Sequence, residues 1–294
     1  MENNFQKIAN KVSVITIIGN VVLSVLKLVA GLIAHSNAII SDAIHSASDV
    51  FSTIVVIIGI KFASKEPDKE HPYGHERLEC VTTIILAMIL FMTGLEIGLE
   101  ALKKIFNADY PHNAPGILAF IAAIISIIGK EGMYWYTRYY AKMIDSDALM
   151  ADAWHHRSDA FSSIGALIGI GGAKLGFPIM DSIASIVISA FIAKASYDIF
   201  KDAMDKMIDH ACDDETETQI RTCVMENENV MGIDLLKTRI FGNKIYVDVE
   251  ILADAACTLK EAHLIARKVH NKIEETFPKV KHIMVYVNPA ENSE

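Results

Sequence analysis

The sequence has few charged residues, no closely spaced pair of cysteines and no excess of basic residues. Each of these shortages excludes a class of protein. Charged residues fill only 21% of its 294 positions and hydrophobic ones 52%, which is too apolar for a soluble domain with one ordinary core. A net charge of −9 argues against a nucleic-acid partner. An integral membrane protein is the first interpretation. Neither a disulfide framework nor a zinc ribbon is indicated, because no C-x-x-C pair links Cys80, Cys212, Cys223 and Cys257.

Long apolar runs occupy the first two thirds of the chain. Each is close to the ~20 residues that a helix needs to cross the hydrocarbon of a bilayer. They predict an all-α bundle of six transmembrane helices, with both termini on one side. Basic residues gather in the loops around 64–79 and 138–146 and beside both ends of the helical region, so the positive-inside rule places these loops and both termini in the cytoplasm. The predicted spans are roughly 12–34, 37–63, 80–102, 116–140, 147–172 and 179–200.

The composition changes at about Ile208. From there to Glu294 the chain has no spanning run and carries 16 Asp and Glu against 10 Lys and Arg. We therefore expect a membrane domain over 1–207 and a separate cytosolic domain over 208–294. The order of predicted elements, α-β-β-α-β, indicates a small ferredoxin-like α+β fold. The expected helices are 213–229 and 259–276, and the expected strands lie near 234–238, 245–252 and 282–287.

An internal repeat places the same polar pattern in two predicted spans. Residues 41–53 read SDAIHSASDVFST and residues 151–163 read ADAWHHRSDAFSS, with seven identities in thirteen positions. Each copy holds His-x-x-x-Asp, and residues four apart lie on one face of a helix. Both pairs are expected near the bilayer middle, where a charge costs several kcal/mol unless it has a partner. The pairs are His45 with Asp49 and His155 with Asp159.

Together the two pairs make a set of two imidazoles and two carboxylates. Four such ligands suit tetrahedral zinc, although cobalt, ferrous iron and cadmium also accept them. The alternative is that these groups only hydrogen-bond helices together, but packing does not require the same spacing twice. Asp42 and Asp152 stand three residues before each His. They either orient the ligands, line an access path, or are simply solvated at the helix ends.

The remaining charges in the spans are ambiguous, among them Lys27, Lys130 and Glu131. Lys130 and Glu131 could pair with each other or line a water-filled cavity, and Lys27 could snorkel toward the membrane surface.

The paired motifs, the loop Asp68–Arg77 (DKEHPYGHER), the six spans and the acidic tail resemble the cation diffusion facilitator family. The resemblance covers nearly the whole chain. It implies a multi-pass secondary transporter, not an enzyme, that exports divalent metal from the cytoplasm in exchange for protons. It also implies a homodimer in a bacterial-type cell membrane, with the metal as substrate and no cofactor. The transport site would be His45, Asp49, His155 and Asp159, a composition that resembles zinc-carrying members.

The resemblance implies a second metal site in the loop between spans two and three. Asp68, His71 and His75 match it. With no fourth fixed ligand, this site should be partly open to water. The alternative is an ordinary solvated polar loop.

A third site is expected in the cytosolic domain, where zinc-exporting members of the family carry histidines. Only one imidazole remains at these positions, so we expect a weak, oxygen-rich site built on Asp234, Glu250 and His263. The corresponding positions are Asp234, Glu250, His263, Tyr286 and Asn288.

Two other classes of function compete with zinc export, besides export of iron, manganese, cobalt or cadmium. An intramembrane metallohydrolase would also need buried His and Asp, but the chain has no H-E-x-x-H motif, and Pro72 follows the first His of the pair His71 and His75. A metal-sensing membrane protein that does not transport would give no flux after reconstitution.

Overall fold

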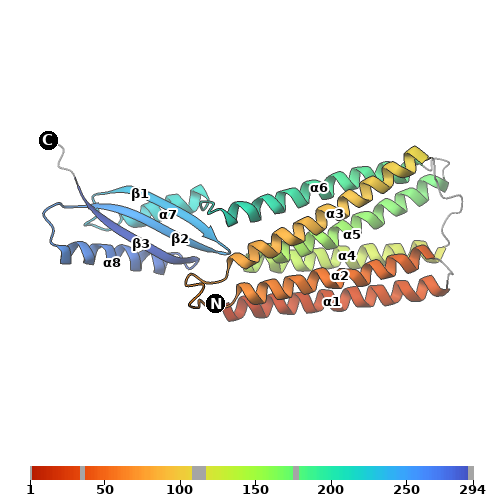
Figure 1. The fold of residues 1–294 in the computed structure, drawn as a ribbon, viewed down its shortest axis with the longest axis horizontal. Helices are drawn as coiled ribbons and strands as arrows, with labels where there is room; N and C mark the ends of the chain where they lie inside the picture. The colour runs from red at the N-terminus through yellow and green to blue at the C-terminus, as the bar shows by residue number, and fades with distance from the viewer. Residues whose placement is uncertain (1, 34–36, 108–116, 175–178, 291–294) are drawn as a thin grey trace. The chain divides into compact units, whose positions relative to one another are not determined.

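The computed structural model describes residues 2–33, 37–107, 117–174 and 179–290 (Figure 1). The chain divides into two compact units, Met1–Ala203 and Met204–Glu294. The described residues of the first unit are helical except for the loop 64–76 and the turn at 145–146, and its helices run side by side as one bundle. They are α1 (Glu2–Ile33), α2 (Asn37–Ala63), α3 (Arg77–Asn107), α4 (Ile117–Ile144), α5 (Asp147–Lys174) and α6 (Ile179–Met207), the last of which reaches into the second unit.

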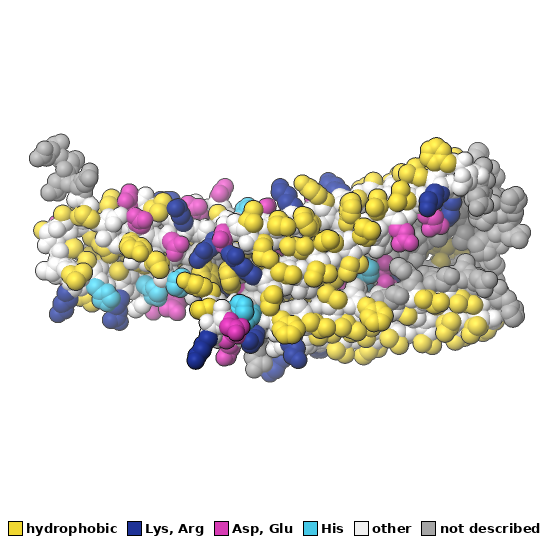
Figure 2. Space-filling view, viewed as in Figure 1, with side chains coloured by type: hydrophobic (Ala, Val, Ile, Leu, Met, Phe, Trp, Pro, Cys, Tyr) yellow, Lys and Arg dark blue, Asp and Glu magenta, His cyan; other side chains and the backbone are white. Residues whose placement is uncertain are grey.

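These helices have the length and the outer surface that a bilayer requires. The shortest has 27 residues and the longest 32, which corresponds to about 40–48 Å. Large apolar side chains stay exposed on their outer faces, among them Phe51 at 71% and Ile128 at 68%, and Figure 2 shows hydrophobic side chains over most of the visible helical surface. The predicted six-helix bundle is confirmed. By length and composition alone, candidate spans are Phe5–Ile33, Arg77–Asn107 and Ser182–Met207.

Most helices extend past the apolar runs that predicted them. α1 begins at Glu2, well before residue 12, and α6 continues beyond residue 200 to Met207. The polar ends contain Glu, Gln and Lys, which are good helix formers in water. Apolar length therefore marks where a helix can meet lipid, and not where the helix begins or ends.

Glycines allow the helices of the bundle to approach closely. A Cβ added at Gly59 of α2 would collide with the Thr82 side chain of α3. One added at Gly165 of α5 would lie 3.0 Å from Ile188 of α6. Such contacts bring helix backbones near each other, as expected where lipid supplies no hydrophobic driving force between helices.

Replacing Gly59 with Ala tests this packing. The new methyl group must push Thr82 and α3 away, so we expect a loss of about 1–3 kcal/mol of stability, which outweighs the ~1 kcal/mol that Ala gains over Gly in a helix. Gly132→Ala is the matched control, because nothing lies within 4 Å of its added Cβ. Thermal unfolding of the purified protein in detergent should show a lower Tm for Gly59→Ala only. Equal Tm values would mean that α2 and α3 are farther apart than described.

The second unit follows the predicted α-β-β-α-β order. Its sheet has the strand order β1-β2-β3, with β1 antiparallel and β3 parallel to the central β2. Two capped helices complete it: Asp213 accepts a hydrogen bond from the Thr216 N–H, and Thr258 forms a capping box with Glu261. The elements are α7 (Asp214–Met225), β1 (Gly232–Phe241), β2 (Lys244–Ala253), α8 (Leu259–Thr276) and β3 (Val280–Pro289).

The core of this unit lies between the two helices and one face of the sheet. Alternate residues of β2, namely Val247, Val249 and Ile251, are buried there against α7 and α8. Because side chains alternate across a strand, Glu250 points to the opposite face. Tyr286, paired with Glu250 in the register of β2 and β3, is 60% exposed. The sheet therefore has one covered apolar face and one open face.

Candidate metal centres

Three ligand-bearing side chains of the internal repeat meet inside the helical bundle. Asp49 comes from α2, and His155 and Asp159 come from α5; one ligand atom of each lies within 4.8 Å of the others. His155 Nε2 is 3.3 Å from Asp49 Oδ1. The three residues are only 3–7% exposed. The side chain of His45, the fourth predicted ligand, lies outside the described part of the chain, although its backbone belongs to α2.

A lysine lies between the two carboxylates of this cluster. Lys130 Nζ, on α4, donates to Asp49 Oδ2 at 2.5 Å and to Asp159 Oδ2 at 2.8 Å. A third hydrogen bond, of 2.9 Å, goes to Asn20 Oδ1 on α1. Sequence reasoning did not find Lys130 and Asn20 as members of the site, because neither lies in the repeated motif.

Two of the alternatives for charges in the spans do not hold. Glu131 does not pair with Lys130, because it accepts a hydrogen bond from Trp135 Nε1 at 2.9 Å while Lys130 is held by the aspartates. Lys27 does not snorkel: it is 4% exposed and donates to Ser46 Oγ at 2.8 Å. For Lys27 a buried polar partner within the bundle replaces contact with the membrane surface, whereas the partner of Glu131, Trp135, is exposed.

A second buried polar pair adjoins the cluster on α5. Asp152 and His156 are both fully buried, with His156 Nε2 3.7 Å from Asp152 Oδ2. Thr53 of α2 donates to Asp152 Oδ1 at 3.2 Å. Full burial excludes solvation at a helix end for Asp152; the side chain of its counterpart Asp42 lies outside the described residues. His156 directly follows the predicted ligand His155, and these two adjacent histidines were the sequence signal that could have identified it.

The loop after α2 brings its three predicted ligands together. One ligand atom from each of Asp68, His71 and His75 lies within 4.8 Å of the others. His71 Nδ1 is 3.4 Å from Asp68 Oδ1, and His75 Nε2 is 3.5 Å from Asp68 Oδ2. His75 is 8% exposed and His71 is open to solvent, so the cluster has one inner wall and one open side.

Local backbone geometry explains why these residues converge. Asp68 Oδ1 accepts the backbone N–H of His71 at 2.8 Å, and Gly74, at φ 101°, adopts a backbone conformation that favours glycine. Lys65 donates to Asp68 Oδ2 at 2.5 Å. This ammonium and the His71 N–H hold the pKa of Asp68 well below its usual range, so the carboxylate stays ionised at neutral pH.

In the second unit, only some of the residues of the predicted metal site lie together. Asn288 Nδ2 donates to Asp234 Oδ2 at 3.1 Å and to Glu250 Oε2 at 2.9 Å, so these two carboxylates lie together. Asp234 sits at a register shift between β1 and β2, and Glu250 is on the open face of the sheet. His263 is exposed on α8, which packs against the other face, and among the described residues it does not join the carboxylates in a cluster of three ligands.

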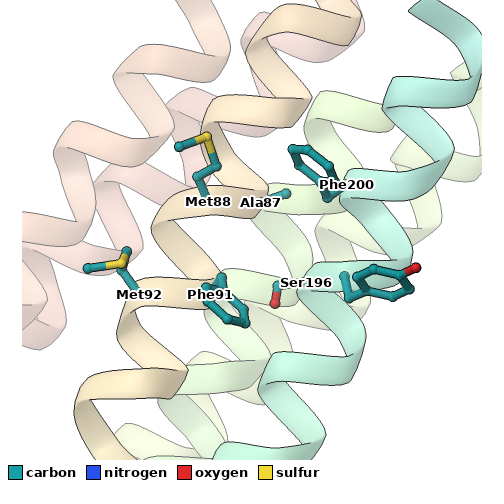
Figure 3. A pocket seen from close by; sticks show the side chains of 7 residues that line it. Ala87, Met88, Phe91, Met92, Ser196 and Phe200 are labelled. Atoms are coloured by element: carbon teal, nitrogen blue, oxygen red, sulfur yellow. The ribbon is translucent and has the colours of Figure 1, made fainter.

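The groove between α3 and α6 has a different character. It encloses about 250 Å³ (Figure 3). Ser196 contributes one of its few polar groups, and its hydroxyl already donates to the Ala193 carbonyl at 2.9 Å. We therefore do not consider the groove a metal centre. It is lined by Ala87, Met88, Phe91, Met92, Ser196, Tyr197 and Phe200.

Comparison with known proteins agrees with the two-unit organisation. The family model of the cation efflux transmembrane domain matches residues 13–208, and that of the cation efflux protein cytoplasmic domain matches residues 212–290. The chain belongs to the cation diffusion facilitator family.

Two relatives that match most of this chain support this assignment. An uncharacterised transporter of Methanocaldococcus jannaschii is 36% identical over 89% of this chain and 92% of that protein. The manganese efflux system protein MneP of Bacillus subtilis is 31% identical over 98% and 99% of the two chains. A solved nickel form of a MamM CTD variant is 22% identical and covers 27% of this chain and 100% of its own, with a TM-score of 0.27.

Membership of the cation diffusion facilitator family makes the chain an integral membrane protein for efflux of divalent metal. Because this is a family of transporters, membership is consistent with the expectation that the chain is not an enzyme. The polar clusters described above are then candidate positions for the transported ion.

The loop cluster of this cation diffusion facilitator protein gives a testable prediction. His75→Gln removes the buried imidazole next to Asp68 and should reduce the number of zinc ions bound per chain, because two ligands on an open loop hold metal poorly. His270→Gln is the control, since His270 lies on the surface of α8 beside Glu274. Equilibrium dialysis of the full chain in detergent gives the stoichiometry. An unchanged stoichiometry for His75→Gln would favour the solvated-loop interpretation.

Proposed function

We propose that this protein exports a divalent transition metal, with zinc as the leading candidate, from the cytoplasm in exchange for protons. The proposed transport site consists of His45, Asp49, His155 and Asp159. One observation carries the proposal: ligand atoms of three of these residues, from α2 and α5, lie within 4.8 Å of one another in the interior of the bundle. Carboxylates so deeply buried in a membrane domain are costly and indicate function.

Proton exchange follows from the chemistry of the ligands. A neutral imidazole and an ionised carboxylate bind metal, whereas protonation of the same groups expels it. One set of residues can thus serve both ions in turn. The two proposed ligand pairs stand on different helices, α2 and α5, so relative movement of these helices would open the site to one side and then the other.

The choice of metal rests on the ligand types. Two imidazole nitrogens and two carboxylate oxygens suit tetrahedral zinc. Manganese is the second candidate, because one relative that matches nearly the whole chain is named a manganese efflux protein. A site with more oxygen and less nitrogen would favour that harder ion.

We place both termini, the loop around Asp68 and the second unit in the cytoplasm, on the basis of the distribution of basic residues. The bacterial-type cell membrane and the homodimer are inferred from the family resemblance. Asp68, His71 and His75 would form a loop site on the side from which metal enters. The carboxylates of Asp234 and Glu250 provide a weak cytosolic site. Because His263 packs on the other side of the sheet, it can take part only if a partner subunit contributes it.

Asp159→Asn tests the transport site. It keeps the shape of the side chain but removes a charged ligand, so we expect zinc flux into proteoliposomes to fall at least about 100-fold. Asp198→Asn, at an exposed position on α6, should transport at the wild-type rate. Size-exclusion chromatography checks that both variants are folded. Flux at the wild-type rate in Asp159→Asn would show that the site is misassigned, and absence of flux in the wild type would favour a sensor.

His155→Asp tests the choice of metal. Replacing an imidazole by a carboxylate hardens the ligand set, so the ratio of manganese to zinc flux should rise. Zn, Mn, Fe, Co and Cd are compared side by side in the same vesicles. If the ratios stay unchanged, His155 does not determine selectivity.

A further inference from the structure

Lys130 is bound by the same two carboxylates that are proposed to bind the metal. Its Nζ lies 2.5 Å from Asp49 Oδ2 and 2.8 Å from Asp159 Oδ2, and the residue is 1% exposed. Asn20 Oδ1 accepts the third hydrogen bond at 2.9 Å. A lysine ammonium has three N–H donors, so all of them are used here. The lysine is therefore an integral part of the cluster.

The ammonium and a metal ion compete for the same two carboxylates. Zinc binds carboxylate oxygens at ~2.0–2.2 Å. Two cations held that closely around one oxygen repel each other strongly in a buried site. A metal ion bound at Oδ2 thus requires Lys130 Nζ to withdraw from that atom, and one bound at Asp49 Oδ1, which faces His155, still lies close to the ammonium on the same carboxylate. The Asn20 carbonyl group, on a different helix, is a contact that the ammonium can keep as it withdraws.

The charge of the cluster leads to the same conclusion. With His155 neutral, the two ionised aspartates and Lys130 carry a net charge of −1, and a divalent ion would change this to +1. Without the lysine, the corresponding change would be from −2 to zero. Neutralisation is favourable in a buried site, whereas a surplus charge is not. The lysine therefore penalises the metal-loaded state relative to the free one.

We propose that Lys130 is a tethered competitor of the transported metal, which lowers the affinity of the site and occupies the two carboxylates again when the metal leaves. This inference rests on the proposed function of the site. It meets a requirement of transport, because a site must bind its ion well enough to load and weakly enough to release. Lys130 thus sets the affinity and the release of the ion, and it is not itself a ligand.

Lys130→Met tests the competition, since it removes the charge and keeps an unbranched side chain. Zinc affinity is measured by calorimetry on the full chain in detergent, in a His75→Gln background that removes the loop cluster. We expect the Kd of Lys130→Met to fall at least about tenfold. Lys130→Arg, which keeps a cation, should stay near the parent. Lys194→Met, at an exposed position on α6, should have no effect.

Lys130→Met leaves two buried carboxylates without a counter-charge and can therefore fail to fold. A second variant covers this case. Lys130→Gln is neutral but can still donate to one of the aspartates. Thermal unfolding is followed with and without zinc. A ligand that binds more tightly raises Tm more, so zinc should raise the Tm of Lys130→Gln by more than that of the parent.

The outcomes separate this inference from the function on which it rests. If the parent binds zinc and both neutral variants bind it equally or more weakly, Lys130 is not a competitor, and the proposed transport site still stands. If parent and neutral variants all bind no more zinc than Asp159→Asn in the same background, both the site and the competition are overturned. Tighter binding in the neutral variants that is lost on adding Asp159→Asn supports both.

Discussion

Two carboxylates buried side by side require a compensating cation, and the helical unit is organised around this constraint. Asp49 and Asp159 are 3% and 7% exposed. A buried carboxylate without a partner costs several kcal/mol, and two of them also repel each other. Lys130 supplies the positive charge, and Asn20 accepts its remaining hydrogen bond. Side chains from α1, α2, α4 and α5 thus meet at one point, which fixes the four helices relative to one another.

The internal repeat extends further than the repeated motif. The offset of 110 residues that relates Asp49 to Asp159 also relates Asn20 to Lys130, which are hydrogen-bonded. Each half of the repeat therefore consists of a pair of helices, α1 with α2 and α4 with α5. Each pair contributes one carboxylate to the cluster. The first pair also contributes the amide that accepts from the ammonium, and the second pair contributes the ammonium itself. The two halves differ at this point in a single respect, since one contributes a neutral amide and the other a cation.

The structure agrees with sequence reasoning about which residues lie together where the determining signal is local. The spacing of His155 and Asp159 is set by one helical turn, the loop residues Asp68, His71 and His75 lie within one short segment, and the predicted helix 259–276 is capped by its own Thr258. Sequence reasoning failed where partners are remote. Lys130 lies 81 residues from Asp49 and 110 from Asn20, and a single lysine in an apolar run carries no sign of which helix it will face. The position of His263 likewise depends on which face of the sheet α8 covers.

The same pair of groups, an ammonium and a carboxylate 2.5 Å apart, occurs in both clusters of the membrane unit, in opposite surroundings. The Lys65 side chain is 56% exposed where it meets Asp68, whereas the Lys130 side chain is 1% exposed where it meets Asp49. An exposed pair contributes at most about 1 kcal/mol and is screened by salt, so another cation can replace the lysine with little penalty. Inside the bundle the interaction is unscreened, and displacing the lysine must be balanced by an equally strong contact. Depth in the bundle therefore sets how readily another cation can displace the lysine from its carboxylate.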